Sequence, residues 1–138
     1  MILVGDTAHH LTRVLRLKTG DQIIVFDQSG YEWDAKIINK KRQSVEIELL
    51  NRHKPDVESP VNITLLQSLS RSHRMDLVMQ KATELGVNSI VPMLTKNTVV
   101  KLNAKNTQKK MHHWKKITIS AAEQSGRVRL PELLEPRE

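Results

Sequence analysis

Hydrophobic positions in the first fifty residues alternate in a way that is typical of a small antiparallel sheet. Polar turns bound two apolar segments, 22–27 and 31–38, which we predict to be strands joined by a hairpin. Val45, Ile47 and Leu49 then alternate with glutamates, which is the pattern of a half-buried third strand. Because a lone three-stranded sheet is only marginally stable, we expect further strands or a partner for this segment.

A short helix is predicted ahead of these strands. Asp6 is a candidate N-cap, and Leu11, Val14 and Leu15 follow at helical spacings of three and four residues. This spacing predicts a helix with one buried apolar stripe. Three basic side chains fall on its polar face: His10, Arg13 and Arg16.

The pattern changes after residues 51–60, which contain two prolines, several charges and no apolar period. We interpret this segment as a linker, because such stretches commonly separate domains. The sequence therefore divides into a domain over residues 1–57 and a second domain over residues 58–138.

The second domain alternates predicted strands with predicted helices. Apolar runs at 61–66 and 87–94 are typical of buried parallel strands. Ser70 or Ser72 is a candidate N-cap for the helix between them, and the helix after the second run has Asn103 or Asn106 as its candidate N-cap. The first helix has an apolar stripe formed by Met75, Val78 or Met79, Ala82 and Leu85, and Gly86 sits where a C′ glycine would end it. This order predicts a parallel α/β sheet, with only two strands before the last residue, Glu138.

Charge adds a candidate partner to this picture. The formal net charge is +7, and residues 58–138 carry 13 basic against 7 acidic residues. A basic balance favours a polyanion such as nucleic acid, although a solvated basic surface has the same composition. The four aromatic residues are too few for an extended base-stacking platform: Phe26, Tyr31, Trp33 and Trp114.

Composition also excludes several classes of protein. There is no cysteine, which excludes a disulfide scaffold and a thiolate metal site. No apolar run approaches the roughly 18 residues that a membrane span needs, so we expect no membrane association and a cytoplasmic location. The adjacent pairs His9-His10 and His112-His113 lack the spacing of zinc enzymes, so no metal site is predicted.

A basic stretch and three polar segments are the candidates for function. Residues 101–116 carry six lysines and no acidic residue, so the helix either contacts nucleic acid or presents a solvated face anchored by Trp114. Ligands of open α/β sheets bind outside the carboxyl ends of the strands, so loops 67–74 and 95–103 are candidates to line a cleft. For Glu84 and Arg127, the alternative to a functional role is an ion pair at a helix end. The polar segments are 70–76, 80–87 and 121–127.

Several of these stretches together resemble one known family. The sequence is similar to the bacterial small-subunit ribosomal RNA methyltransferase E family, which belongs to the knotted SPOUT methyltransferases. The similarity covers nearly the whole chain in order, with QKATELGV and AAEQSGR among its motifs. The matching stretches are 10–21, 74–76, 80–87, 90–92 and 114–127, followed by Pro131.

The resemblance implies an α/β protein of two parts. The first, residues 1–57, would be a PUA-like RNA-binding β-barrel whose N-terminus is incomplete. The second, residues 58–138, would be the N-terminal part of a parallel α/β SPOUT domain that lacks the trefoil knot. The family methylates N3 of a uridine in 16S rRNA with S-adenosylmethionine, acts as a cytoplasmic homodimer and needs no metal.

The resemblance also implies roles for individual residues. Gln124 and Arg127 are the candidate catalytic residues, because hydrogen-bonding or cationic groups would favour the deprotonated N3. We expect the main cofactor site to lie beyond Glu138, with no cofactor-binding residue in this chain, so that the chain alone would be inactive. A non-catalytic RNA-binding module and a structural or dimerisation fragment remain as alternatives. The candidate RNA-binding residues are His10, Arg13, Arg16, Arg74 and Lys101.

Overall fold

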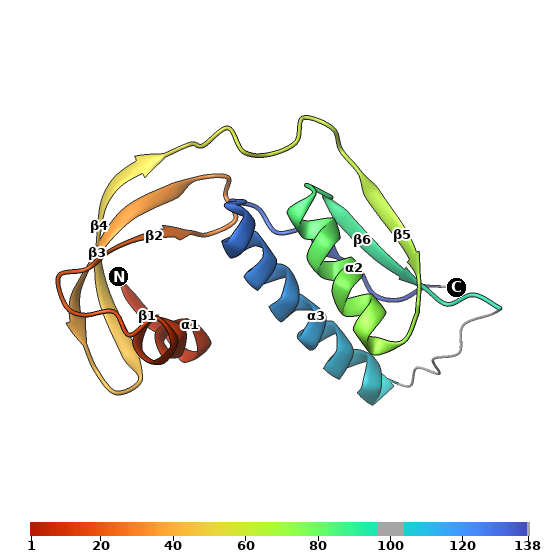
Figure 1. The fold of residues 1–138 in the computed structure, drawn as a ribbon, viewed down its shortest axis with the longest axis horizontal. Coiled ribbons are helices and arrows are strands. Elements are labelled where there is room, and N and C mark those ends of the chain that lie inside the picture. The colour runs from red at the N-terminus through yellow and green to blue at the C-terminus, as the bar shows by residue number, and fades with distance from the viewer. Residues whose placement is uncertain (97–103, 138) are drawn as a thin grey trace. The chain divides into compact units, whose positions relative to one another are not determined.

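Two compact units make up the chain. The computed structural model describes residues 1–96 and 104–137, and it divides into Met1–Pro55 and Asp56–Glu138 (Figure 1). The first unit therefore ends at Pro55, whereas the sequence analysis ended the first domain at residue 57. Each unit has its own hydrophobic core and is described by itself.

The first unit is a curled antiparallel sheet with the strand order β1-β4-β3-β2 (Figure 1). The pairing of β3 with β4 contains two register shifts, between Trp33 and Ala35 and between Ile37 and Asn39, and such interruptions of a ladder bend and twist a sheet. The expectation of a further strand is confirmed, because β1 pairs with β4. The strand β4 runs into the segment predicted as linker. The strands are β1 (Ile2–Val4), β2 (Gln22–Phe26), β3 (Glu32–Lys40) and β4 (Ser44–His53).

A short helical segment connects β1 to β2, but its start differs from the prediction. The helix α1 (Gly5–His9) continues into the π-helix η1 (His10–Val14). Its N-cap residue is Val4, so the assignment of Asp6 as N-cap is wrong. Gly5 has φ +65°, a left-handed conformation that lets the chain turn from the strand directly into the helix.

The π-helix explains why the predicted apolar stripe is only partly buried. The backbone N–H of Leu15 donates to the carbonyl of His10 at 3.0 Å, five residues back, which widens the turn. Leu11 is buried, whereas Val14 and Leu15 are 59% and 52% exposed. The stripe was wrong for these two residues because the spacing rule assumed a regular α-helix.

The core of the first unit lies between this helical segment and the concave face of the sheet. Leu3, Leu17, Ile23 and Val25 are partly buried against it. The Lys40 ammonium donates a hydrogen bond to the carbonyl of Leu17 and so holds the loop after η1 in place. The buried residues of this core are Ala8, Leu11, Ala35, Ile37, Val45 and Ile47.

The second unit contains a parallel sheet with the strand order β5-β6-β7. The predicted parallel pairing is confirmed by β5 (Thr64–Ser68) and β6 (Ser89–Met93). The expectation of only two strands is wrong, because β7 (Glu132–Leu133) pairs with β6 in parallel. A strand of two residues is too short for an alternating pattern to reveal it. Its backbone N–H groups nevertheless complete the ladder, beginning with Glu132, which donates to the Asn88 carbonyl at 2.8 Å.

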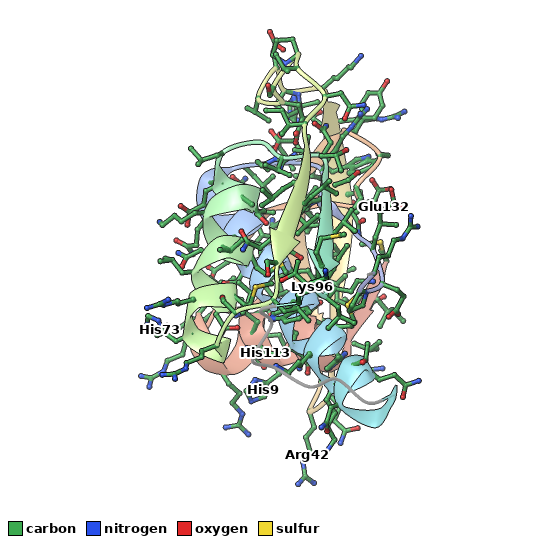
Figure 2. The ribbon with its side chains drawn as sticks, turned by 90° about the vertical axis from the view of Figure 1, so that its right-hand side faces the viewer. His9, Arg42, His73, Lys96, His113 and Glu132 are labelled. Atoms are coloured by element: carbon green, nitrogen blue, oxygen red, sulfur yellow. The ribbon has the colours of Figure 1, made fainter. Side chains whose placement is uncertain are left out.

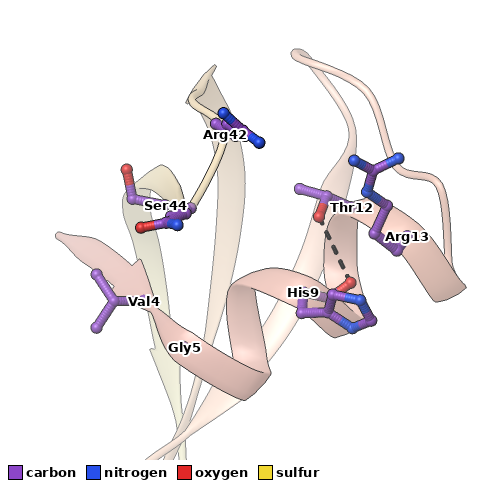
Figure 3. A pocket seen from close by; sticks show the side chains of 8 residues that line it. Val4, Gly5, His9, Thr12, Arg13, Arg42 and Ser44 are labelled. Carbon is purple, nitrogen blue, oxygen red and sulfur yellow. Dashed lines mark hydrogen bonds between the residues drawn. The ribbon is translucent and has the colours of Figure 1, made fainter.

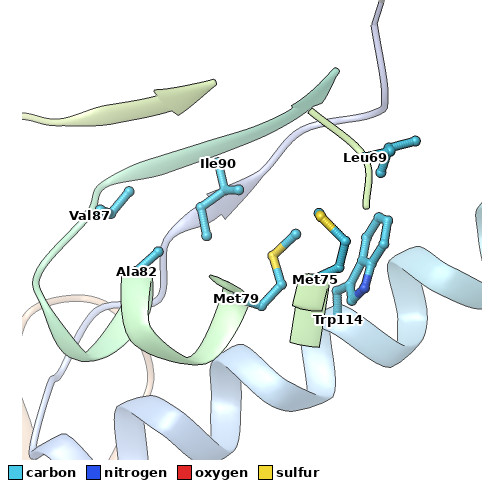
Figure 4. Packing of buried hydrophobic residues seen from close by; sticks show 7 residues of the cluster. All are labelled: Leu69, Met75, Met79, Ala82, Val87, Ile90 and Trp114. Carbon is cyan, nitrogen blue, oxygen red and sulfur yellow. The ribbon is translucent and has the colours of Figure 1, made fainter. Parts of the chain in front are cut away.

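Two helices pack on one face of this sheet (Figure 4). The helix α2 (Ser72–Glu84) has Arg71 as its N-cap residue, without a side-chain capping bond, so the predicted serine cap is wrong. Gly86, with φ +89°, follows the helix where the sequence predicted its end. The helix α3 (Ala104–Ser125) already contains Asn106, so the assignment of Asn106 as its N-cap is wrong, and the other candidate cap, Asn103, lies outside the described residues.

The core of the second unit joins all three strands to both helices. Leu65, Ile90 and Leu133 lie opposite one another in the parallel register and face this cluster. Trp114 of α3 is 2% exposed, which confirms that it anchors the helix, while Lys109, Lys115 and Lys116 are exposed. The predicted stripe of α2 is buried except for Leu85, which is exposed, and Val78, which is half-buried. The buried apolar residues are Leu69, Met75, Met79, Ala82, Val87, Ile90 and Trp114.

A polar contact on the surface adds to the packing of the two helices. The His113 Nε2 of α3 lies 3.1 Å from the Asp76 Oδ1 of α2. Both side chains are partly exposed, so this pair contributes little beside the buried cluster. No helix in the described part of the chain is long and apolar enough to cross a membrane.

We predict that Trp114→Ala destabilises the second unit by about 3–5 kcal/mol, because it removes a large buried side chain and leaves a cavity. Urea denaturation followed by far-UV circular dichroism measures this loss, and the fluorescence of Trp33 reports on the first unit separately. Lys115→Ala, at the exposed neighbouring position, is the matched control and should change stability by less than about 0.5 kcal/mol. Equal stability of the two variants would contradict the packing described above.

Candidate nucleic-acid interface

The first unit has a pocket between its helical segment and the β3–β4 hairpin (Figure 3). Its volume is about 430 Å³. Basic and hydroxyl-bearing side chains predominate in its walls, and no acidic residue lines it. The lining residues are Val4, Gly5, His9, Thr12, Arg13, Arg42, Gln43 and Ser44.

The pocket arises from the way β1 leaves the sheet. Val4, the last residue of β1, pairs with Ser44, the first residue of β4. Gly5 then turns the chain into the helix, so that the helix and the β3–β4 turn diverge from this pair and leave a space between them. Arg42 comes from the turn and Arg13 from η1, which places two guanidinium groups on different walls (Figure 3).

Local hydrogen bonds fix the helical wall of the pocket. The Thr12 hydroxyl donates to the carbonyl of Ala8 at 2.7 Å, which holds this side chain against its own helix. At the end of the segment Arg16 has φ 54°, and the N–H of Leu17 donates to the carbonyl of Leu11 at 3.0 Å. A left-handed conformation is unfavourable for a non-glycine residue, so this reversal of the chain is locally strained.

The structure brings only one of the predicted RNA-binding residues to the pocket. Arg13 lines it, whereas His10 of η1 and Arg16, just after η1, are exposed but not in the lining. Arg74 is exposed in the first turn of α2, and Lys101 lies outside the described residues. These five assignments stay predictions.

Sequence reasoning missed two of the basic residues in this pocket. Arg42 lies in the polar stretch between the second and third predicted strands, where no function is indicated, and His9 stands out only as half of an adjacent histidine pair. No local pattern joins positions so far apart along the chain. The pairing of β1 with β4 brings them together, and the sequence analysis did not include that first strand.

The carboxyl ends of β5 and β6 form the second candidate site. The hydroxyl groups of Ser68 and Thr95 lie 3.1 Å apart, and the N–H of Leu69 donates to the carbonyl of Met93 at 2.9 Å. The starts of the two predicted cleft loops are therefore adjacent, while residues 97–103 lie outside the described part of the chain. Among the described residues, no group of three or more histidine, aspartate or glutamate side chains could hold a metal ion.

Arg127, one of the two predicted catalytic residues, is held in a buried ion pair. Its side chain is 5% exposed, and its Nε and Nη2 donate to the Glu58 Oε2 at 3.1 and 2.7 Å. Its Nη1 donates to the carbonyls of Thr83 at 2.9 Å and Val87 at 3.1 Å. The second oxygen of Glu58 accepts the backbone N–H groups that follow, those of Val128 and Arg129.

This geometry favours the ion-pair alternative for Arg127, with a different partner from the one considered. Glu84 pairs instead with Lys81 at 2.7 Å, and the hydrogen bonds from Lys81 and Gln80 hold the pKa of Glu84 below its ordinary value. A direct contact between Arg127 and a substrate would require breaking several of the bonds above. Gln124 is exposed near the end of α3, and its catalytic role stays a prediction.

Comparison with known proteins identifies the family. A family model described as an RNA methyltransferase domain matches residues 57–138, and one described as an RNA methyltransferase PUA domain matches residues 3–50. The chain belongs to this RNA methyltransferase family. The predicted α/β fold class, a small PUA-like β-barrel followed by part of a parallel α/β SPOUT domain, is thereby confirmed, with the first domain seen as a curled antiparallel sheet.

Individual members of the RNA methyltransferase family are similar over nearly the whole chain. The ribosomal RNA small subunit methyltransferase E of Bacillus subtilis is 31% identical over 133 residues, which cover 96% of this chain and 52% of the relative. The protein of that name from Buchnera aphidicola (Acyrthosiphon pisum symbiont) is 33% identical over 134 residues, covering 97% and 53%. The chain thus spans about half the length of the curated relatives it matches.

A solved structure of the same family overlays closely. The ribosomal RNA small subunit methyltransferase E from Neisseria gonorrhoeae, bound to S-adenosyl methionine, has a TM-score of 0.94 and 36% sequence identity. The match covers 99% of this chain and 56% of that one. The backbone described here is therefore that of an RNA methyltransferase over the matched part.

We predict that Arg127→Met destabilises the second unit by about 3 kcal/mol, because the Glu58 carboxylate is left without its partner. Urea denaturation measures the effect without any assay of activity. Arg129→Met, at an exposed position nearby, is the control.

The double variant Glu58→Met with Arg127→Met should lose less stability than the sum of the single variants, because no unpaired charge remains. Additive losses in this double-mutant cycle would contradict the pairing.

Proposed function

We propose that this chain contributes to the S-adenosylmethionine-dependent methylation of N3 of a uridine in 16S rRNA. The observation that carries the proposal is the overlay on the ribosomal RNA methyltransferase E of Neisseria gonorrhoeae, which was solved with the cofactor bound. The matches of both family models to RNA methyltransferase domains support the same reaction class.

S-adenosylmethionine supplies an electrophilic methyl group on a sulfonium. The described residues do not fit this cofactor by themselves. The carboxyl ends of β5 and β6 offer two hydroxyl groups, and a Cβ added at Gly126 would meet no atom within 4 Å, so no close cradle surrounds this glycine.

The chain's own contribution is to hold and orient the RNA. His10 and Arg13 lie on η1 and Arg16 lies in the loop that follows it, and all three are exposed, as phosphate contacts require. Arg74 and Lys101 are further proposed contacts. Gln124 is the proposed donor that favours the deprotonated N3, and Arg127 acts by fixing the segment that follows Gln124.

The family resemblance supports two further assignments. We propose a cytoplasmic homodimer acting on the small ribosomal subunit. A non-catalytic RNA-binding module is the competing function, and the following experiment separates the two.

We expect the protein that contains this chain to transfer a radiolabelled methyl group from S-adenosylmethionine to small-subunit ribosomal RNA. Nuclease digestion and mass spectrometry should place the label on N3 of a uridine. Large-subunit ribosomal RNA is the matched control. RNA binding without any label transfer would refute the enzymatic function and support the RNA-binding module.

Joint replacement of His10, Arg13 and Arg16 by alanine should weaken RNA binding and flatten its salt dependence, because fewer counterions are released. Filter binding at several salt concentrations measures both quantities. A control variant with Lys36, Arg52 and Lys54 replaced loses the same number of basic residues from strand β3 and from β4 and its following segment. An unchanged salt slope in the first variant would argue against these contacts.

A further inference from the structure

We propose that the pocket between the π-helix and the β3–β4 hairpin binds one nucleotide of an RNA strand, with its phosphate between Arg13 and Arg42. The inference rests on the proposed function, because RNA is the source of the ligand. It adds residues that the sequence did not single out for RNA, above all Arg42 and His9.

The size of the pocket indicates more than an inorganic ion. Its volume of about 430 Å³ falls within the roughly 300–1,000 Å³ that is usual for small-molecule sites. A bare phosphate would leave most of that space to water. A nucleotide fills it with a sugar or a base, while the phosphate remains against the arginines.

The charges around the pocket favour an anion. Arg13 and Arg42 reach it from different elements, and neither has an ion-pair partner among the described residues. Their guanidinium groups can each donate two parallel hydrogen bonds to phosphate oxygens. His9 lines the same pocket, and Figure 2 shows His9 and Arg42 at the same end of the first unit.

The hydroxyl groups of the wall add a preference for a sugar or base. Thr12 already donates its proton to the carbonyl of Ala8 at 2.7 Å, so its oxygen is left to accept a hydrogen bond from a ligand. A ribose hydroxyl or a base N–H is such a donor, and a phosphate dianion is not. Ser44, on the sheet wall, can donate or accept.

The backbone of the helical wall is also unusual where the pocket forms. The wall includes the π-helical turn His10–Val14, and Arg16, two residues after its end, has φ 54°. π-turns and left-handed non-glycine residues are found preferentially at functional sites, because both need compensation from the surrounding structure. Here the π-turn keeps Leu11 buried while Thr12 and Arg13 line the pocket.

Fluorescence anisotropy with a labelled short single-stranded RNA tests the role of Arg42. Arg42→Ala should weaken binding about tenfold and lower the salt slope by about 1, because one charge-assisted phosphate contact is lost. Lys41→Ala removes the same charge from the neighbouring position in the hairpin, outside the pocket lining, and should weaken binding by less than about twofold. Equal effects of the two variants, with unchanged circular dichroism spectra, would overturn the proposal.

A double-mutant cycle tests whether both arginines hold one phosphate. If they do, Arg13→Ala and Arg42→Ala should be non-additive, since the second replacement acts on a contact already weakened. Arg13→Ala combined with Lys41→Ala should be additive. Additivity in both cycles would overturn the shared phosphate.

NMR titration of the 138-residue chain tests the nucleotide. Uridine 5′-monophosphate should shift the amide signals of His9, Thr12 and Ser44, while uridine and inorganic phosphate at the same concentration should shift them much less. Equal shifts with inorganic phosphate would overturn the nucleotide in favour of a simple anion site. Shifts spread over all basic segments would likewise overturn the pocket.

The methyl-transfer assay separates this inference from the proposed function. If wild-type protein transfers no methyl group but Arg42→Ala still weakens RNA binding more than Lys41→Ala, the pocket stands and the enzymatic function fails. If methyl transfer occurs and the two variants bind RNA equally, the function stands and the pocket is overturned.

Discussion

The buried ion pair between Arg127 and Glu58 is the constraint on which the second unit depends. Glu58 lies just before the first parallel strand, and Arg127 just after the last helix. Through the carbonyls of Thr83 and Val87, the same guanidinium also holds the turn between α2 and β6. Because a buried charge without its partner is costly, all of these segments must be in place together. The carboxyl group further fixes the two backbone amides that lead toward β7.

Local patterns in the sequence predicted most of the regular structure. The alternation of apolar residues in β4 and the glycine after α2 correspond to the observed strand and helix end. The two strands that went unpredicted, β1 and β7, contain three and two residues, too few for a period to be recognised. Each exists because a longer strand, β4 or β6, offers it a free edge. That kind of information lies in tertiary pairing and not in the segment itself.

The candidate sites were harder to predict than the fold, for a related reason. Basic residues near a helix could be named, but which of them share a pocket depends on the pairing of Val4 with Ser44. For Arg127 the difficulty was different, because the residue could be singled out from its motif but its partner could not. Its motif indicated importance, but only the position of Glu58, far away in the sequence, shows that its guanidinium is used inside the protein. The types of residue therefore indicated which chemistry was possible. The long-range contacts in the structure show which of these residues lie together and which are held in internal pairs.

The π-turn in η1 makes the length of this segment as important as its composition. A π-turn holds one more residue per turn than the α-helix around it, so it is equivalent to a single-residue insertion. Deleting one residue there would leave a regular helix with its apolar residues intact. Every later side chain of the segment would then rotate by about 100° around the helix axis. A deletion of one residue that keeps the apolar residues of the segment would therefore turn Arg13 away from Arg42.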